Sequence, residues 1–348
     1  MTAPANLSGT ANDIIHGDDD MGKICGKCSS YVSEGSCPVC GYSCDDDSIS
    51  AALTAGTVLD DRYVVGKVIG SGGFGITYLA YDTVLEKTIA VKEFYPKGIV
   101  IRGIDKVTIE PITSVYSEEF RVGAEKFRNE AEILSELDDN TDVIKVYDIF
   151  GQNGTVYYAM EYVHGITVSE YTQKYGKISD GQALYTARII ASALEHIHRR
   201  NIIHRDIAPN NIVLGIDGKI KLIDFGNARP FFSDIENSMT VALKPGYAPL
   251  EQYQHHGEHG PWTDIYSLGT VLYYALTLKK PCDPMTRLDN DKEFRDGLSS
   301  VDTRLAAVIN KMSAVKINER YSCSSELLAD LGAVQIKPQE FEIHISGN

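Results

Sequence analysis

The segment that decides the fold is Ile202–Asn211, which reads IIHRDIAPNN. It is followed by Leu222–Gly226, which reads LIDFG. Asp206 can accept a proton from a hydroxyl group. Asn211 and Asp224 can each hold a metal ion, and Mg²⁺ in particular binds one or two carboxylates together with phosphate oxygens. The order and spacing of these three side chains therefore predict a metal-assisted site that works on a phosphate compound.

Upstream, Ile69–Thr77 reads IGSGGFGIT and contains a Gly-x-Gly-x-x-Gly pattern between two strand-like runs. Glycine lets the backbone turn tightly and approach phosphate oxygens closely. The pattern alone is weak, because it also occurs in plain hairpins and in dinucleotide folds. A dinucleotide site needs a helix directly after the loop, whereas Thr77–Tyr81 reads as a strand. We therefore expect a glycine-rich hairpin that covers phosphates.

A lysine and a glutamate form a candidate ion pair behind this loop. Lys92 ends the apolar run IAVK, and Glu130 lies on one stripe of an expected helix near 124–137, together with Phe127 and Leu134. A carboxylate on a core-facing stripe is costly unless it is paired. We expect Lys92 and Glu130 to pair, the alternative being that Glu130 reaches solvent at the helix edge.

The four motifs together resemble the eukaryotic-type (Hanks-type) protein kinases over about residues 61–331. The glycine-rich loop, IAVK, HRD…N and DFG occur in that family's order and in workable spacing. The sequences IAVKEFYP, HRDIAPNN and GYAPLEQY are most similar to bacterial serine/threonine kinases, some of which carry zinc ribbons. The resemblance implies an α+β, bilobal fold with a β-rich N-lobe at residues 61–162 and an α-helical C-lobe at residues 163–333.

The resemblance also implies a role for each matching residue. Lys92, held by Glu130, would orient the α- and β-phosphates of ATP. Asp206 would position and deprotonate the acceptor hydroxyl, while Asn211 and Asp224 would hold Mg²⁺. Met160 would be the gatekeeper, and Glu161 and Val163 would bind the adenine edge through their backbone. Ile69, Ala90 and Val213 would enclose the adenine ring. The full set of residues expected to contact the nucleotide is Ile69, Gly70, Gly72, Gly75, Thr77, Ala90, Lys92, Met160, Glu161, Val163 and Val213.

Away from the nucleotide, the resemblance implies three supporting contacts. Asp264 would brace the catalytic loop, and Glu251 would pair with Arg320. Arg205 would bind a phosphate on the activation segment through charge-assisted hydrogen bonds. The candidate phosphate acceptors are Ser233, Ser238 and Thr240, of which we favour Thr240.

The chain departs from the family pattern at two positions that belong together. Serine/threonine kinases usually carry a lysine two places after the catalytic aspartate, where this chain has Ala208, and a threonine where this chain has Lys244. These positions face each other in the family, so the pair looks exchanged. We expect Lys244 to supply the cation that is missing at position 208, the alternative being a solvated lysine that contacts substrate.

A third departure is an insertion. Lys92 and Glu130 are 38 positions apart, about twice the usual interval in the family. The extra segment, about 96–116, reads as a hairpin with strands at 100–102 and 107–109. The APE-like motif of the family reads PLE at 249–251, and its glutamate is intact.

The N-terminal region carries five of the seven cysteines. Two Cys-x-x-Cys pairs lie eight residues apart, and such pairs give the tetrahedral sulfur set that Zn²⁺ favours. About twenty residues cannot bury a core of their own, so the metal would supply the folding free energy. We expect a structural zinc ribbon at residues 21–44 with four ligands, Cys25, Cys28, Cys37 and Cys40. The alternatives are Cys44 in place of Cys40 as the fourth ligand, a redox dithiol, and a chance cluster of cysteines.

Composition and charge complete the layout. With 33 basic and 48 acidic residues, the net charge of −15 argues against nucleic-acid binding, and neither a membrane-spanning run nor a secretory signal is visible. We therefore expect a cytoplasmic location. The predicted segments around the 61–333 kinase domain are a disordered N-terminus (1–20), the zinc ribbon (21–44), an acidic flexible linker (45–60) and a C-terminal tail (334–348).

The function predicted from the sequence is ATP- and Mg²⁺-dependent transfer of phosphoryl groups to Ser/Thr hydroxyls of proteins, including autophosphorylation. One alternative is a pseudokinase or ATP-binding scaffold that recruits partners through the zinc ribbon; another is a small-molecule kinase. The expected partners are protein substrates and a docking partner on the zinc ribbon, with a redox or metal sensor as the other role for that ribbon. The sequence leaves the oligomeric state open.

Overall fold

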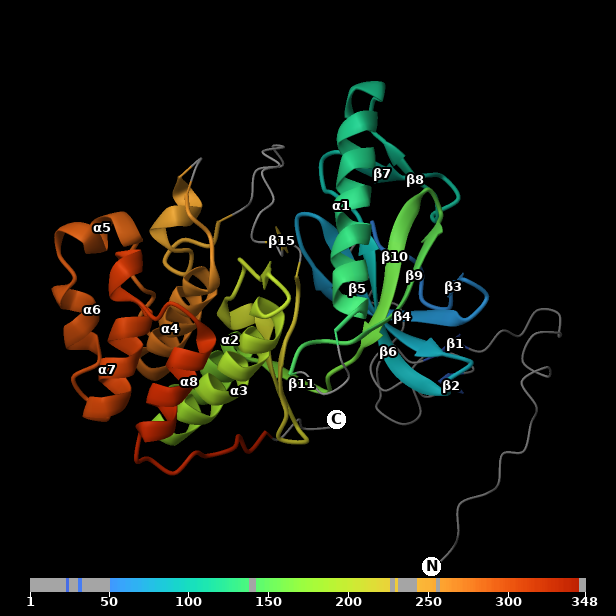
Figure 1. Cartoon of the computed structure of the whole chain (residues 1–348). Helices are drawn as coiled ribbons and strands as arrows, with labels where there is room; N and C mark the ends of the chain where they lie inside the picture. The colour runs from blue at the N-terminus through green and yellow to red at the C-terminus, as the bar shows by residue number, and fades with distance from the viewer. Residues whose placement is uncertain are drawn as a thin grey trace, which may run out of the picture. The chain divides into compact units, whose positions relative to one another are not determined.

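The computed structural model describes residues 51–137, 142–225, 243–254 and 257–343, and the backbone of three further short strands, β1 (Lys23–Ile24), β2 (Tyr31–Val32) and β15 (Arg229–Pro230). The chain forms two compact units. The described residues up to Phe120, with Phe150–Ala159, belong to the first unit, and the remainder belongs to the second. Strands dominate the first unit and helices dominate the second (Figure 1).

The first unit is built on a six-stranded sheet in the order β3-β4-β5-β6-β10-β9. The sequence pattern predicts strands at 63–69, 77–81, 88–94 and 156–160, and these are present as four of the six strands, each extending one or two residues beyond those limits. Many of the side chains in this sheet are buried, and β10 is buried continuously from Thr155 to Ala159. The strands are β3 (Val58–Leu59), β4 (Tyr63–Ser71), β5 (Gly75–Asp82), β6 (Lys87–Phe94), β9 (Val146–Gln152) and β10 (Thr155–Glu161).

The insertion after β6 forms the expected hairpin, with a shift in its second strand. Strand β7 (Val100–Arg102) pairs with β8 (Ile109–Pro111), so the second strand begins two residues later than predicted. The Asp105 carboxylate accepts hydrogen bonds from the backbone N–H groups of Val107 and Thr108. These bonds keep the two residues in the turn, which explains the shift.

A 3₁₀ turn, η2 (Ser114–Tyr116), leads into helix α1 (Ser117–Ser135), which begins seven residues before the predicted start at 124. The first turn of α1 carries Glu118 and Glu119, which favour a helix N-terminus. Phe120, also in this early part, stacks on Phe94 of β6. The predicted buried stripe is correct, because Phe127, Glu130, Leu134 and Leu137 are all buried.

The second unit is a helical bundle with short strands beside it. Helix α3 packs against α4 and α8, and α4 also packs against α7 (Figure 1). The sequence pattern predicts helices at 182–198, 264–278 and 303–312, and α3, α4 and α7 confirm these three to within three residues at each end. The elements are β11 (Gly165–Thr167), α2 (Val168–Tyr175), α3 (Asp180–His198), β12 (Ile202–Ile203), η3 (Pro209–Asn211), β13 (Ile212–Gly215), β14 (Ile220–Leu222), η4 (Leu250–Tyr253), α4 (Pro261–Thr277), α5 (Pro284–Asp289), α6 (Lys292–Gly297), α7 (Thr303–Met312), η5 (Ile317–Glu319) and α8 (Ser324–Ala333).

Local sequence signals set the limits of these helices. The side chains of Ser179 and Gln182 form a reciprocal capping box at the start of α3. Helix α4 begins with Pro261 at its first position and ends at Thr277, because the next residue, Leu278, has a left-handed backbone (φ 59°). These limits fix where the loop between α3 and β13 starts, and that loop carries Asp206.

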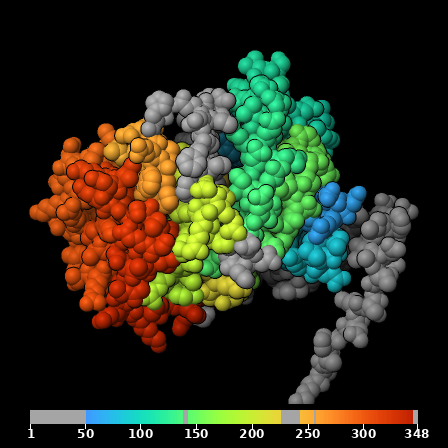
Figure 2. Space-filling model, in the orientation of Figure 1, coloured from blue at the N-terminus to red at the C-terminus, as the bar shows by residue number. Residues whose placement is uncertain are grey.

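The chain after α8 packs on the helical unit, a contact that the sequence did not indicate. Gln339 donates its backbone N–H to the carbonyl of Gly181, and the ring of Phe341 meets that of Tyr171 edge-on at 5.0 Å. The space-filling view shows the C-terminal residues, in red, forming one continuous surface with the neighbouring helices of this unit (Figure 2). The residues from 334 to 343 therefore belong to the folded helical unit.

Several sequence predictions fall on parts of the chain outside the described residues. These are the disordered N-terminus, the zinc ribbon with its four cysteines, the first part of the linker and the candidate phosphate acceptors Ser233, Ser238 and Thr240. Within the described ranges, no helix combines the length and the apolar character that crossing a bilayer requires.

Candidate active site

The loop between β12 and β13 holds Asp206 through the amide side chain of Asn211. Asn211 lies in η3 and donates its Nδ2 hydrogens to the backbone carbonyl of Asp206 at 2.7 Å and to its Oδ2 atom at 3.1 Å. Pro209 stands at the start of η3, where its fixed φ suits the turn. Because the amide nitrogen is used in this way, the Oδ1 atom of Asn211 is the one that can bind a cation.

Lys244 reaches the same carboxylate from a distant part of the chain. Its Nζ atom lies 3.0 Å from Oδ2 of Asp206. The Lys244 side chain is 35% exposed and that of Asp206 is 15% exposed, so the contact is partly shielded from water. Burial raises the pKa of Asp206 above its ordinary value, and the Lys244 ammonium offsets only part of that rise.

The residue at position 208 has no charged group to offer this site. Ala208 is 2% exposed and packed among its neighbours. The only ammonium group within hydrogen-bond distance of Asp206 among the described residues is therefore that of Lys244. This is the arrangement expected if the lysine and the small residue have exchanged places.

Asp264, at the start of α4, fixes the backbone that carries Asp206. Its two carboxylate oxygens accept the backbone N–H groups of His204 at 2.9 Å and Arg205 at 2.8 Å. Its Oδ2 atom also lies 2.8 Å from Nε2 of His198. Burial alone would raise the pKa of Asp264, but the His198 contact and the backbone N–H donors bring it below its ordinary value. The expected bracing role of Asp264 matches this geometry.

Asp224 lies directly beyond β14 and is tied to the same loop. The backbone N–H of its neighbour Ile223 donates to the carbonyl of Asn211 at 2.9 Å. Asp224 has a left-handed backbone (φ 62°), which is uncommon outside glycine and occurs often at functional sites. Phe225 is buried against the ring of His204 at 4.3 Å. These contacts anchor both sides of Asp224 in the helical unit.

Asn211 and Asp224 suit a magnesium ion better than a transition metal. Both present oxygen atoms, which Mg²⁺ prefers, and Mg²⁺ needs only one or two carboxylates when phosphate oxygens complete its shell. Among the described residues, no group of three or more His, Cys, Asp or Glu side chains could hold a metal on its own. The donor set therefore fits an ion that arrives with a phosphate compound.

In the first unit, β4 and β5 are joined by the glycine-rich loop. A strand follows this loop, so the expected hairpin is confirmed and the dinucleotide alternative is excluded. A Cβ atom on Gly75 would lie 2.6 Å from the Glu93 carbonyl oxygen, so only glycine fits there. Added Cβ atoms on Gly72 and Gly73 would have no described neighbour within 4 Å, so space remains beside the loop for a ligand.

Lys92 lies on β6, directly opposite Thr77 of β5. Its ammonium group is 5.5 Å from the centre of the Tyr158 ring, within the range of a cation–π contact. Glu130 is 7% exposed on α1, as the stripe predicted. The two residues belong to different units, and their pairing stays a prediction.

The residues expected around adenine are divided between the units in the same way. In the first unit Ala90 is buried and Ile69 is 39% exposed, while in the second unit Val213 is buried. Glu161 donates its backbone N–H to the Lys145 carbonyl, and its carboxylate lies 3.3 Å from Lys221. These contacts fix the segment that would bind the adenine edge, and the binding itself stays a prediction.

Two further contacts support the catalytic loop from the C-terminal side. Glu251 and Arg320 form the expected ion pair at 2.7 Å, with both side chains almost fully buried. The guanidinium of Arg205 contacts Nε2 of His259 at 3.0 Å. This second contact was not expected from the sequence, because His259 lies in a polar loop, which suggests a solvated side chain.

Comparison with known proteins agrees with this geometry. A family model described as "Protein kinase domain" matches residues 63–331. The chain is 32% identical over 292 residues to "Serine/threonine-protein kinase PknA" of Nostoc sp., which covers 81% of this chain and 49% of that protein. It is 34% identical over 288 residues to "Serine/threonine-protein kinase PrkC" of Bacillus subtilis, which covers 80% of this chain and 41% of that protein.

A solved structure titled "PpkA-294 apo form" matches with a TM-score of 0.69 and 29% identity. The match covers 81% of this chain and 99% of that one. The chain thus spans about half or less of the length of the two curated relatives above, but nearly all of this solved structure.

Proposed function

Because the chain belongs to the protein kinase family, we propose that it is an active serine/threonine kinase that transfers the γ-phosphoryl group of ATP to protein hydroxyls, including its own. The observation that carries this proposal is the joining of Asp206, Asn211 and Lys244 by direct side-chain contacts. An inactive scaffold has no need of a buried carboxylate held in this way. The two relatives, both named as serine/threonine kinases, support the same acceptor class.

We assign to Asp206 the role of binding the hydroxyl group of the phosphoryl acceptor. Its contacts with Lys244 and with the Asn211 amide both fall on Oδ2, so we assign Oδ1 to the incoming hydroxyl group. There it would orient the hydroxyl and accept its proton as the phosphoryl group is transferred. The Asp264 carboxylate keeps this loop in place through two backbone hydrogen bonds.

We assign to Lys244 the role of the positive charge that kinases of this family usually carry at position 208. An ammonium group held beside Asp206 can stabilise negative charge on the transferring phosphoryl without reorganising. Asn211 and Asp224 would hold Mg²⁺, which when bound neutralises charge on the phosphate oxygens. Lys92, paired with Glu130, would orient the α- and β-phosphates beneath the glycine-rich loop.

Two assignments concern residues outside the described ranges. Cys25, Cys28, Cys37 and Cys40 would bind one structural Zn²⁺, and the resulting ribbon would dock a protein partner. Arg205 would bind a phosphate on Thr240. Metal analysis of the purified chain and of a Cys25→Ser/Cys37→Ser variant tests the ribbon, with one zinc per wild-type chain expected and the zinc lost in the variant.

The proposed activity is tested by incubating the full chain with radiolabelled ATP, Mg²⁺ and dephosphorylated casein, beside an Asp206→Asn variant. We expect label on phosphoserine or phosphothreonine with the wild type and none with the variant. The asparagine keeps the shape of the site, so its loss of activity would not reflect unfolding.

The same assay separates the alternatives. Nucleotide binding without transfer to protein would favour the scaffold, for which Ala208 is the supporting observation. Transfer to small hydroxyl compounds but not to protein would favour a small-molecule kinase. Equal labelling by the wild type and by Asp206→Asn would contradict the catalytic assignment of Asp206.

A further inference from the structure

Glu93, the residue next to Lys92, is a fully buried carboxylate in the first unit. Successive side chains on a strand point to opposite faces of the sheet. Glu93 therefore lies on the face opposite Lys92, and whatever holds Glu93 also fixes the backbone of β6 at the lysine. A buried carboxylate is tolerated only where donors surround it.

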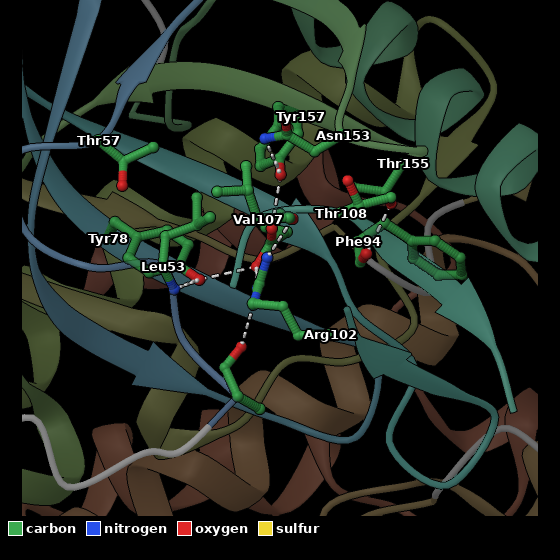
Figure 3. A network of polar contacts seen from close by, with 12 residues as sticks. Leu53, Thr57, Tyr78, Phe94, Arg102, Val107, Thr108, Asn153, Thr155 and Tyr157 are labelled. Carbon is green, nitrogen blue, oxygen red and sulfur yellow. Dashed lines mark hydrogen bonds and ion pairs between the residues drawn. The ribbon is translucent and has the colours of Figure 1, made fainter. Parts of the chain in front are cut away.

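Three donors from three different strands meet this carboxylate. The hydroxyls of Tyr157 on β10 and Tyr78 on β5 donate at 2.6 and 2.7 Å, and Arg102 on β7 donates at 2.6 Å. Figure 3 shows these three labelled side chains converging from separate parts of the unit. Burial, and next the Glu93 charge, raise the pKa of both tyrosine hydroxyls well above its ordinary value, so both remain protonated donors.

Arg102 uses all three of its guanidinium nitrogens in this network. Besides Glu93, it donates to the carbonyl of Val107 in the inserted hairpin at 2.8 Å and to that of Ala51 at 2.7 Å. Leu53, two residues beyond Ala51, donates its backbone N–H to the Tyr78 hydroxyl. One planar side chain therefore joins β6, the insertion and the segment that precedes the sheet, which a single ammonium group could not do.

The chain directly after Glu93 also holds the glycine-rich loop. The backbone N–H groups of Tyr95 and Lys97 donate to the carbonyls of Phe74 and Gly73, at 3.0 and 2.9 Å. The Arg102 guanidinium lies over the ring of Tyr95, 5.5 Å from its centre. The backbone of β6 at Glu93 therefore sets the position of Lys92, which precedes it. It also sets the position of the tip of the glycine-rich loop, which is hydrogen-bonded to the residues that follow it.

We propose that Arg102 is a positioning residue for nucleotide binding: by holding Glu93, it fixes both Lys92 and the glycine-rich loop, and the insertion at 96–116 is the element that supplies it. The proposal rests on the proposed function only in taking Lys92 and the loop as the parts that bind the phosphates. It explains why an insertion can separate Lys92 from Glu130 and still serve the site.

The test uses full-length variants with the network altered in two ways. Glu93→Gln/Arg102→Met removes the charge pair together, so no lone buried charge remains, and Arg102→Lys keeps the charge but not the three-way geometry. The matched control is Arg62→Met, because Arg62 forms a comparable two-bond contact with the buried Asp82 at 2.9 and 2.8 Å. Asp82 lies opposite Lys87, at the end of β5 and β6 away from Lys92.

The melting temperature of each protein is measured first. The KM of ATP and the KM of the protein acceptor are then determined well below that temperature. The rate at which an ATP-site acylating reagent modifies Lys92 is measured by mass spectrometry. We expect the double variant and Arg102→Lys to raise the KM of ATP about 10-fold or more, since small misplacements of a positioned group cost this much or more. The KM of the acceptor should change less than about twofold, and Lys92 labelling should slow in parallel with ATP binding.

A merely structural role predicts something different, namely a lower melting temperature with no change in the KM of ATP. That result in the double variant, or an equal rise in the KM of ATP in Arg62→Met, would overturn the proposal. A wild-type chain that binds no ATP would contradict the proposed function itself, and this separate arm distinguishes the two failures.

Discussion

The ammonium group of Lys244 lies 3.0 Å from the Asp206 carboxylate, although 38 residues of chain separate them. The residue two places after Asp206, where kinases of this type usually carry a lysine, is the buried Ala208. The cation beside the aspartate therefore comes from the segment before η4 and not from the catalytic loop. This relationship makes the site testable by exchanging single residues.

Removing the cation should impair transfer and spare nucleotide binding. We expect Lys244→Ala to lower kcat by about 10²-fold or more, the size typical of losing one preorganised charge, with the KM of ATP nearly unchanged. Steady-state kinetics with varied ATP and acceptor measures both values. Lys219→Ala is the matched control, because Lys219 pairs with Asp217 on the exposed surface of the same unit. Wild-type turnover in Lys244→Ala would refute the assignment.

Restoring the usual arrangement should restore activity. In Ala208→Lys/Lys244→Thr, the lysine returns to the catalytic loop and a small hydroxyl side chain replaces it at 244. We expect this double variant to recover at least about tenfold in kcat over Lys244→Thr alone, because the same charge again stands beside the phosphoryl group. Additive losses in the double variant would show that the two positions do not exchange roles.

The pH profile should respond to the same lysine. Burial raises the pKa of Asp206, and Lys244 lowers it in part. Because Asp206 accepts a proton only when ionised, kcat/KM should fall as the pH drops through this pKa, starting at a higher pH than for an ordinary aspartate. Removing the ammonium lets the pKa rise further, so the acid limb of Lys244→Ala should move to still higher pH. A limb that stays in place or moves down would contradict this reasoning.

The Glu251–Arg320 ion pair should contribute to the stability of the fold and not to catalysis. Both side chains are nearly inaccessible to water, and Arg320 also donates to the backbone carbonyls of Ala314 and Val315. Replacing Arg320 with Met leaves a buried carboxylate without its cation, which costs about 3–5 kcal/mol. Urea denaturation should show this loss, whereas Lys316→Ala, from an exposed pair in the same region, should leave the unfolding midpoint nearly unchanged. Equal midpoints for Arg320→Met and the wild type would count against it.

The sequence predicted the elements that have a local signal. Period-two and helical patterns identified strands β4, β5, β6 and β10 and helices α1, α3, α4 and α7, and the stripe that contains Glu130 correctly placed it in a buried position. The errors lie where side chains act on the backbone. Asp105 holds Val107 and Thr108 in a turn and delays β8, and the contact of Phe120 with Phe94 accompanies the early start of α1.

The polar network of the first unit could not have been read from the sequence. Tyr157 is 64 positions from Glu93, and Arg102, nine positions from it, lies in the inserted hairpin; each is an ordinary residue in its local context. A cation from Lys244 near the site, by contrast, was expected, because two departures from one family pattern pointed at each other; its contact with Asp206 was not specified. Sequence reasoning thus anticipated the contacts of Asp264 and of Glu251 with Arg320, for which a family pattern existed, and missed the network around Glu93.

The central claim is that this chain holds a nucleotide through a divalent cation bound by Asn211 and Asp224. Isothermal titration calorimetry of ATP into the full chain, with Mg²⁺ and with a chelator, tests it most directly, beside Asp224→Asn. We predict that the wild type binds ATP far more tightly with Mg²⁺ and that Asp224→Asn loses this gain. No binding by the wild type, or binding that is equally tight in the chelator, would contradict the account.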